Sequence, residues 1–305
     1  MTDTIYIGVD GGGTKTAFVA VDEAGTEVSR LALSTSNAAV IGHDAAGAVL
    51  RTGLERLVAD ARATLGGVWL GLSGSDRPED HRRLKPHIAH LTSDIRMSND
   101  AELALAALPN QTGLVVVAGT GSIAFGYDAA GKRARSGGWG QILGDEGSGY
   151  DLARLMLQAF TAEVDGRGPA TACYTMVMEH LQLEEPFQLI QWVYDQGRTK
   201  GDIAALSAIT LDAADTGDAV AQRIVIASAG ALAHTALAAA RRLDLPSPLP
   251  LALTGGLLTG SERFRSAFLD AFGAKFPSLN VRMVTDPALT AAQALADVHM
   301  RMGTT

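Results

Sequence analysis

The segment Ile5–Val21 constrains the fold more than any other part of this chain. Its sequence is Ile-Tyr-Ile-Gly-Val-Asp-Gly-Gly-Gly-Thr-Lys-Thr-Ala-Phe-Val-Ala-Val. The runs Ile5–Val9 and Ala17–Val21 contain the β-branched and aromatic residues that are typical of strands. Between them, three consecutive glycines can adopt backbone angles closed to other residues and leave their N–H groups facing outward. Such a row of N–H groups binds anions, so the segment predicts a phosphate-binding β-hairpin. An ordinary glycine-rich hairpin is the alternative for this segment taken alone.

Polar side chains in the turn strengthen the phosphate-binding interpretation. Thr14 adds a hydroxyl group, Lys15 adds a positive charge, and Asp10 places a carboxylate at the strand end that can hold Mg²⁺ through water. The residues predicted to contact phosphate are Gly11, Gly12, Gly13, Thr14 and Lys15.

The same pattern occurs a second time. The apolar run Leu114–Ala118 meets a turn made of Gly119, Thr120, Gly121 and Ser122, and Ile123–Tyr127 continues as a strand. Both copies then reach an Asp-x-x-Gly turn, Asp22–Gly25 in the first and Asp128–Gly131 in the second. Repeats of this kind define the architecture of a chain. We therefore expect two related halves, each starting with a phosphate loop, that clamp one nucleotide.

Composition limits the class of protein. At 305 residues, the length predicts about two domains, and 47% hydrophobic residues suffice for a core in each. A formal net charge of −8 argues against a nucleic-acid or anionic-membrane surface. The single cysteine, Cys173, excludes a disulfide framework, a zinc knuckle or an iron–sulfur site within the chain and favours a reducing cytosol. The apolar run Ile224–Ala240 is shorter than a membrane span and is interpreted as a buried helix.

Two polar residues follow predicted strands in the first half. Asn37 lies in a loop after a possible third strand and is a candidate ligand contact, with turn or capping duty as the alternative. Asp100 lies between the short strand Ile95–Met97 and a predicted helix over 101–108, the position at which open α/β sheets place reacting groups. The alternative is that Asp100 or Ser98 only caps that helix.

A second glycine-rich run lies between 136 and 149 and holds six glycines in fourteen residues, with Trp139, Asp145 and Glu146 among them. It predicts close approach of the backbone to a polar ligand beside an aromatic wall. Helix capping is the alternative for the two acids. Farther along, Leu249–Thr254 is predicted as a strand, and a helix is predicted to begin near Ser261. Gly255 and Gly256 form the turn after the strand. This turn suits the ribose or base of a nucleotide, and a plain tight turn is the alternative.

Two rival nucleotide motifs do not fit. Gly8 and Gly13 have the spacing of a P-loop, but Thr14-Lys15 stands where Lys followed by Ser or Thr is required, and no helix is predicted next. The run Gly119–Ala124 follows a strand like a dinucleotide fingerprint. However, a strand and turn are predicted after it instead of the helix that this fingerprint requires.

With these residues in view, the chain resembles the sugar kinase/Hsp70/actin superfamily, and within it the N-acetylglucosamine kinase branch of the BadF/BadG/BcrA/BcrD ATPase family. The resemblance is most specific at Asp10–Lys15, Ser98–Asp100, Gly119–Ser122 and Gly138–Ser148. It implies ATP contacts at Thr14 and Thr120, with an adenosine turn at Gly255 and Gly256. It also implies that Asp100 is the catalytic base. The implied sugar contacts are Asn37, Asp100, Ser122, Gly138, Trp139, Gly140 and Asp145.

The resemblance also implies an α/β, two-lobed actin-like ATPase fold made of duplicated ribonuclease H-like domains, with the active site in the interlobe cleft. We expect one lobe from 1–112 joined by the C-terminal helix 287–305, and a second lobe from 113–286. The implied reaction is ATP- and Mg²⁺-dependent phosphorylation of the C6 hydroxyl of N-acetylglucosamine by a cytoplasmic homodimer. Glucosamine kinase, an ATP-driven activator of a reductase and a sugar sensor without turnover are the alternatives.

Overall fold

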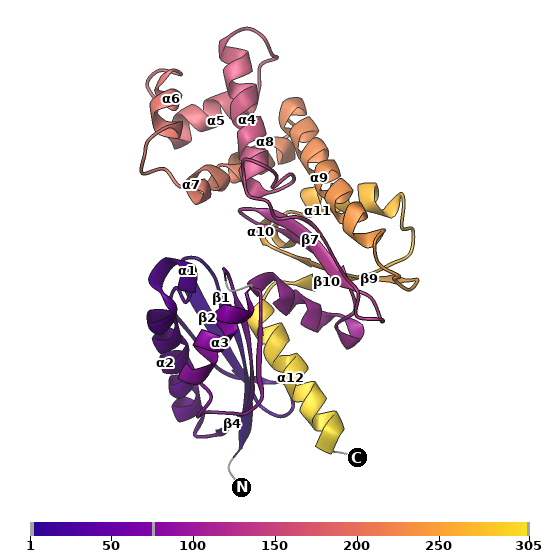
Figure 1. Ribbon diagram of the computed structural model, residues 1–305. Helices are drawn as coiled ribbons and strands as arrows, with labels where there is room; N and C mark the ends of the chain where they lie inside the picture. Colours follow the sequence, from indigo (N-terminus) through magenta and orange to yellow (C-terminus); the bar gives the residue numbers. More distant parts are fainter. Residues whose placement is uncertain (1–2, 75–76, 304–305) are drawn as a thin grey trace. The chain divides into compact units, whose positions relative to one another are not determined.

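The computed structural model describes residues 3–74 and 77–303, and the chain divides into two compact units. The first unit comprises Met1–Gln111 and Val284–Thr305, and the second comprises Thr112–Met283. Each unit is built on one five-stranded sheet with helices packed against it (Figure 1). The C-terminal segment therefore returns to the unit that contains the N-terminus.

The strands of the first unit are β1 (Thr4–Gly11), β2 (Lys15–Val21), β3 (Glu27–Ser34), β4 (Thr64–Leu72) and β5 (Ile95–Ser98). Its α-helices are α1 (Ala38–Ile41), α2 (His43–Ala61), α3 (Pro78–Leu84) and α12 (Pro287–Gly303), and its 3₁₀ helices are η1 (Lys85–His87), η2 (Asp100–Ala107) and η3 (Pro109–Gln111). The strand order is β3-β2-β1-β4-β5.

The central strand β1 is covered on both faces, which explains its nearly continuous apolar sequence. Side chains alternate between the faces of a strand. Ile5, Ile7 and Val9 pack in a core with residues of α2, whereas Tyr6 packs in a second core with residues of α12 and η2. The hairpin that follows is therefore anchored by a strand that is buried from Ile5 to Val9.

Gly8 allows α12 to lie directly on β1 (Figure 1). A Cβ atom at Gly8 would lie 1.9 Å from the backbone oxygen of Ala288.

We expect Gly8→Ala to lower the free energy of unfolding by about 1–3 kcal/mol, because the helix backbone must move. Gly230→Ala is the matched control. Gly230 lies inside a helix with nothing within 4 Å of the added carbon, so the variant is expected to gain about 0.5–1 kcal/mol. Thermal unfolding of both variants and of the unmodified chain tests this prediction. Equal stability of the two variants would contradict it.

The strands of the second unit are β6 (Gly113–Ala118), β7 (Ser122–Tyr127), β8 (Arg133–Gly137), β9 (Leu249–Thr254) and β10 (Leu279–Val284). Its helices are α4 (Gly149–Val164), α5 (Ala172–His180), α6 (Gln188–Val193), α7 (Lys200–Ala205), α8 (Ser207–Asp215), α9 (Ala219–Ala240), α10 (Gly256–Gly260) and α11 (Glu262–Gly273). The strand order is β10-β9-β6-β7-β8.

The predicted repeat is confirmed by the strand pairing. In both units an antiparallel hairpin, β1–β2 or β6–β7, continues into a third antiparallel strand, and the first strand pairs in parallel with β4 or β9. The two Asp-x-x-Gly turns also match. Asp22 Oδ1 accepts hydrogen bonds from the N–H groups of Ala24 and Thr26, and Asp128 Oδ1 accepts them from Ala130 and Lys132.

Helix α9 corrects one argument made from the sequence. It has 22 residues and a mean hydropathy of 1.4 in its most apolar window, so it passes the length and composition tests for a membrane span. The length argument based on Ile224–Ala240 is therefore wrong. The interpretation of this segment as a buried helix is supported by burial instead, because Val225, Leu232 and Ala236 belong to the core of the second unit. Helix α9 is a core helix of this unit.

Two other boundaries differ from the expectations. The helix expected over 101–108 is the 3₁₀ helix η2, which already begins at Asp100. The turn at Gly255 leads at once into the short helix α10, and α11 begins at Glu262 after the N-cap Ser261. After both β5 and β9, the next helix begins earlier in the sequence than the apolar pattern indicates.

Candidate active-site residues

The first unit gathers its candidate residues at one edge of its sheet. Strands β1, β4 and β5 are parallel, with Gly11 paired to Leu72 and Gly71 paired to Ser98. Their carboxyl ends therefore lie at the same edge, where open α/β sheets bind ligands. Asp10, the hairpin turn and Asp100 all belong to this edge.

The hairpin turn is held by two hydrogen bonds to Gly12. The N–H of Gly12 donates to the Lys15 oxygen at 2.9 Å, and the Thr35 hydroxyl donates to the Gly12 oxygen at 2.9 Å. Thr14 and Lys15 are exposed, and nothing lies within 4 Å of a Cβ atom placed on Gly13. The turn thus presents open backbone and two polar side chains to solvent.

None of the three glycines of this turn adopts an unusual backbone angle, contrary to the expectation, and only Gly11 is needed for space. The positive-φ glycines do not include Gly11, Gly12 or Gly13. A Cβ atom at Gly11 would lie 2.5 Å from Ser36 Oγ and 2.7 Å from Leu72 Cδ2. Gly11 is therefore fixed by packing against its neighbours, whereas Gly13 leaves room for a ligand.

Asn37 caps a helix, as the alternative interpretation held. Its Oδ1 accepts a hydrogen bond from the Ala39 N–H at 3.0 Å at the start of α1. A Cβ atom at Gly74, after β4, would lie 2.8 Å from Asn37 Oδ1, so Gly74 keeps space beside the amide. Capping uses the amide oxygen, and the amide nitrogen can still donate to a ligand.

Asp100 is the first residue of η2, and its neighbour Asn99 is the N-cap. The Ala101 N–H donates to Asn99 Oδ1 at 3.0 Å and to Asp100 Oδ1 at 2.9 Å. The side-chain cap of this helix is thus already supplied by Asn99. Asp100 is half-buried at the sheet edge, an environment that suits a group that exchanges protons.

Asp10 shows that negative charge accumulates at this edge. Burial is the main cause that raises the pKa of Asp10 from 3.8 to about 6, followed by the nearby carboxylates Asp100 and Asp286, while Lys15 acts in the opposite direction. Asp286 accepts a hydrogen bond from the Leu289 N–H at the start of α12, and it also accepts one from Arg30 at 2.9 Å. Among the described residues no group of three or more His, Cys, Asp or Glu forms a direct metal-binding cluster.

The raised pKa of Asp10 predicts a pH-dependent cost to stability. Because the pKa in the folded chain lies above the ordinary 3.8, the ionised carboxylate is disfavoured by folding at neutral pH. We expect Asp10→Asn to raise the free energy of unfolding at pH 7, in the presence of a chelator, by on the order of 2 kcal/mol. The gain should shrink as the pH falls from about 6 to about 4, where both states are protonated. Urea unfolding across this pH range measures it, and a variant that is less stable at pH 7 would contradict the prediction.

The second unit also gathers its candidate residues at one sheet edge. Strands β6 and β9 are parallel, with Val117 paired to Thr254, so the turns that follow them are neighbours. Gly255 has φ +90°, and a Cβ atom there would lie 2.4 Å from the Ala118 oxygen. The Gly119 oxygen accepts a hydrogen bond from the Gly149 N–H at 2.7 Å. Thr120 is exposed in the turn. The turn at Gly255 therefore packs against Ala118, the residue that precedes the turn at Gly119–Ser122.

The glycine-rich loop presents its tryptophan to solvent. Trp139 is 69% exposed, with the Arg135 guanidinium 5.6 Å from its ring centroid. Gly138 and Gly140 have φ values of +71° and +83°, which L side chains rarely adopt, so these two glycines are required by the turn. Arg135 also donates to the Gly138 oxygen at 2.7 Å and so holds the loop. The loop therefore offers an exposed aromatic face on a defined backbone.

Asp145 lies buried where this loop meets the turn at Gly119–Ser122. Its side chain accepts a hydrogen bond from the Ser122 N–H at 3.2 Å and forms an ion pair with Lys200, whose Nζ atom lies 2.5 Å away. The Ser122 hydroxyl donates to the backbone oxygen of Glu146 at 2.7 Å. Asp145 has φ +63°, a backbone conformation that is uncommon for residues other than glycine. Lys200 was not predicted from the sequence, and it comes from a region that carries no recognisable motif.

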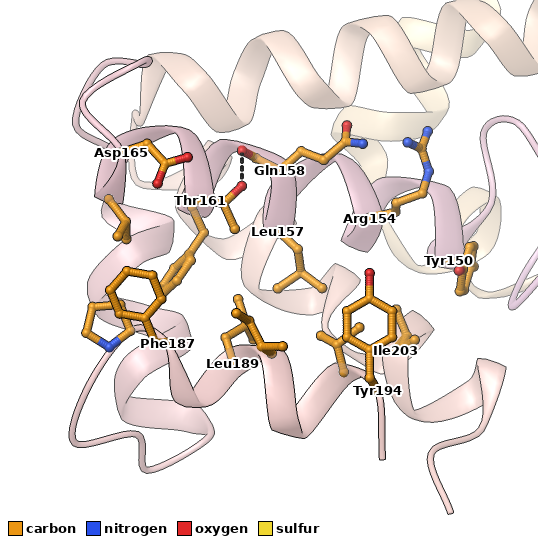
Figure 2. A pocket seen from close by; sticks show the side chains of 15 residues that line it. Tyr150, Arg154, Leu157, Gln158, Thr161, Asp165, Phe187, Leu189, Tyr194 and Ile203 are labelled. Atoms are coloured by element: carbon orange, nitrogen blue, oxygen red, sulfur yellow. Dashed lines mark hydrogen bonds between the residues drawn. The ribbon is translucent and has the colours of Figure 1, made fainter. Parts of the chain in front are cut away.

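An apolar cavity in the second unit lies outside this group of residues. It measures about 560 Å³ and lies among α4, α6 and α7 (Figure 2). Leu157, Phe187, Leu189 and Tyr194 give it an apolar lining, and no residue predicted from the sequence as a site residue lines it. Its chemistry differs from that of the polar sheet edge, where the glycine turns and Asp145 lie.

The fold and these residues define a class of protein. A solved structure from Porphyromonas gingivalis, described as a candidate N-acetylglucosamine kinase, matches 98% of this chain and 100% of its own with a TM-score of 0.76 at 21% identity. The glucokinase of the ROK family from Streptomyces griseus, solved with glucose and AMPPNP, matches 96% and 98% with a TM-score of 0.57 at 17% identity. The chain therefore shares the two-sheet α/β fold of these two structures, as the sequence predicted.

Sequence comparisons define the family. Residues 7–293 match the model of the BadF/BadG/BcrA/BcrD ATPase family, and the chain belongs to this family. The N-acetyl-D-glucosamine kinase of Dictyostelium discoideum is 32% identical over 311 residues, covering 96% of this chain and 98% of the relative. The N-acetylmuramic acid/N-acetylglucosamine kinase of Clostridium acetobutylicum is 31% identical over 286 residues, covering 90% and 92%.

Proposed function

We propose that this protein is an ATP-dependent kinase that phosphorylates the C6 hydroxyl of N-acetylglucosamine, with Asp100 as the general base. The two full-length relatives named as N-acetylglucosamine kinases support the substrate. The observation that carries the mechanism is the shared sheet edge of the first unit. There, the hairpin turn that follows Asp10 and the carboxylate of Asp100 lie at the carboxyl ends of parallel strands.

Phosphoryl transfer needs positioning and charge neutralisation more than covalent help from the protein. In this proposal the ATP phosphates lie against the turns Gly11–Gly13 and Gly119–Gly121 and bind N–H groups other than those of Gly12 and Gly119, which donate to the Lys15 and Gly121 oxygens. Thr14 and Thr120 add hydroxyl contacts. Gly255 and Gly256 accommodate the adenosine. The open space at Gly13 and at Gly119, where a Cβ atom would meet nothing within 4 Å, supports close approach of a ligand to the backbone.

Asp100 would accept the proton of the C6 hydroxyl as its oxygen attacks the γ-phosphorus. General-base help of this kind accelerates reactions by about 10²–10⁴-fold. Asn37 would donate its free amide N–H to a sugar hydroxyl, and Asp145 would accept one. Trp139 would lie against the ring or its 2-substituent, supported by Ser122, Gly138 and Gly140.

The first sheet edge also suits a divalent cation. Carboxylate oxygens are preferred ligands of Mg²⁺, which commonly keeps part of its water shell. The raised pKa of Asp10, caused by burial and then by Asp100 and Asp286, indicates negative charge that a cation would neutralise. We propose that Asp10 holds Mg²⁺ through water. When bound, the ion would neutralise phosphate charge.

The alternatives have less support. A reductase activator of this family would need cysteine ligands for a shared cluster, but Cys173, the one cysteine of the sequence, is fully buried in the core of the second unit. A sugar sensor would have no need of a base at the edge that carries the phosphate loop.

The proposal includes a cytoplasmic homodimer, which the family resemblance supports. Light scattering of the purified protein tests the dimer.

A coupled ADP-release assay with a panel of sugars tests the function. The panel contains N-acetylglucosamine, glucosamine, glucose, N-acetylmannosamine and N-acetylmuramic acid, with a sugar-free reaction as control. We expect N-acetylglucosamine to give the largest kcat/KM. ADP release that is equally fast without sugar would indicate an ATPase, and no release with any sugar would favour a sensor. Either result would overturn the proposal.

A further inference from the structure

Lys200 reaches the buried Asp145 from a distant part of the second unit. Its Nζ atom lies 2.5 Å from Asp145 Oδ2, and the two side chains are 26% and 4% exposed. The same ammonium group lies 2.8 Å from the position that a Cβ atom would occupy on Gly121. Lys200 thus lies against both the second phosphate loop and the acid of the glycine-rich loop.

The backbone of Lys200 is fixed in place. Thr199 is the N-cap of α7, and its side chain and that of Asp202 form a capping box around the start of this helix. One turn later, Ile203 packs against the core of the second unit and lines the apolar cavity together with Tyr150 and Arg154 of α4 (Figure 2). Helix α7 is therefore anchored at both ends of its first turn, and the lysine starts from a defined position.

The ion pair cancels the charge of Asp145 without using up its capacity to accept hydrogen bonds. A carboxylate offers about four lone-pair positions, and the Ser122 N–H and Lys200 occupy two of them. In the proposed reaction, a sugar hydroxyl donates to one of the remaining positions. The other acid of the loop, Glu146, is exposed, where solvent screens its charge.

We infer that Lys200 determines specificity for the 2-substituent of the sugar, an inference that rests on the proposed function. With Asp145 neutralised, the site favours the uncharged N-acetyl group over the ammonium group of protonated glucosamine. Without Lys200, the buried carboxylate attracts that ammonium group. Lys200 thereby decides between two acceptors that share the same hydroxyl groups.

The test compares kcat/KM for N-acetylglucosamine and for glucosamine, at a pH where the amine is protonated, in four proteins. These are the unmodified chain, Lys200→Met, Lys200→Arg and the control Lys132→Met, which removes an exposed lysine from the β7–β8 turn. We expect the N-acetylglucosamine preference to fall about tenfold or more in Lys200→Met. Lys200→Arg should restore it, and Lys132→Met should leave it unchanged.

Equal losses for both sugars in Lys200→Met would overturn the inference, because a lysine that only stabilises the fold would act on both alike. If Lys200→Met does not fold, Lys200→Gln serves as the second neutral variant, because its amide can still donate to Asp145. The same fall in preference is expected from it, and an unchanged preference would overturn the inference. No sugar-dependent ADP release from the unmodified chain would refute the proposed function itself.

Discussion

Asp100→Asn is expected to lower kcat by about two or more orders of magnitude, while the affinity for N-acetylglucosamine stays within a few-fold of the unmodified value. The amide keeps the shape and one acceptor oxygen of the carboxylate but cannot take up the proton of the attacking hydroxyl. The Ala101 N–H, which donates to Asp100 Oδ1 and to Asn99 Oδ1, keeps its partners in the variant. The loss should therefore appear in turnover and not in folding.

Steady-state kinetics together with calorimetric binding of the sugar separate these effects. Glu102→Gln is a suitable control, because Glu102 lies on the same 3₁₀ helix and the change removes one negative charge. We expect near-normal turnover from the control. Near-normal turnover in Asp100→Asn as well would remove Asp100 as the base.

Asp145→Asn is expected to lower kcat/KM for the sugar by about 10²–10³-fold and to change the KM for ATP much less. The substitution removes a charge-assisted acceptor from the sugar and leaves the Lys200 ammonium without its counter-charge. Because the Lys200 side chain is 26% exposed, water screens part of the ammonium charge that the substitution leaves behind. Asparagine tolerates the φ of +63° at this position, so the backbone of the loop should be retained.

Asp128→Asn provides the matched control for this variant. Asp128 is also buried in the second unit. Its carboxylate accepts hydrogen bonds from the N–H groups of Ala130 and Lys132 in the turn after the second hairpin, and from the N–H of Asp244, which follows α9. We expect a lower melting temperature with unchanged KM for the sugar. A similar loss of sugar affinity in both variants would show that Asp145 acts only through stability.

The sequence was sufficient to predict the elements whose signal is local. The two hairpins show alternating β-branched residues, and each is followed by an Asp-x-x-Gly turn that caps its own backbone. Strand pairing then confirmed the repeat. The placement of Asp100 at a strand end was also readable, because Ile95–Met97 and the acid after it are adjacent in sequence.

The contacts that depend on tertiary packing could not be predicted in this way. Lys200 meets Asp145 across 55 residues, and nothing in the sequence around α7 marks it. Asp286 lies near Asp10 only because α12 returns to the first sheet, where Gly8 admits its backbone. The glycines of the first turn illustrate the same limit. Their pattern suggested unusual backbone angles, whereas Gly11 is required by its contact with Ser36 and Leu72.

The most direct test of the proposed reaction is phosphorus NMR of the products formed from ATP and N-acetylglucosamine by the purified protein with Mg²⁺. Transfer to the sugar predicts one new phosphomonoester signal that correlates with the two protons on C6, in amounts equal to the ADP formed. Release of inorganic phosphate with no phosphorylated sugar would contradict the account, and a phosphate on another hydroxyl would contradict the assignment of C6.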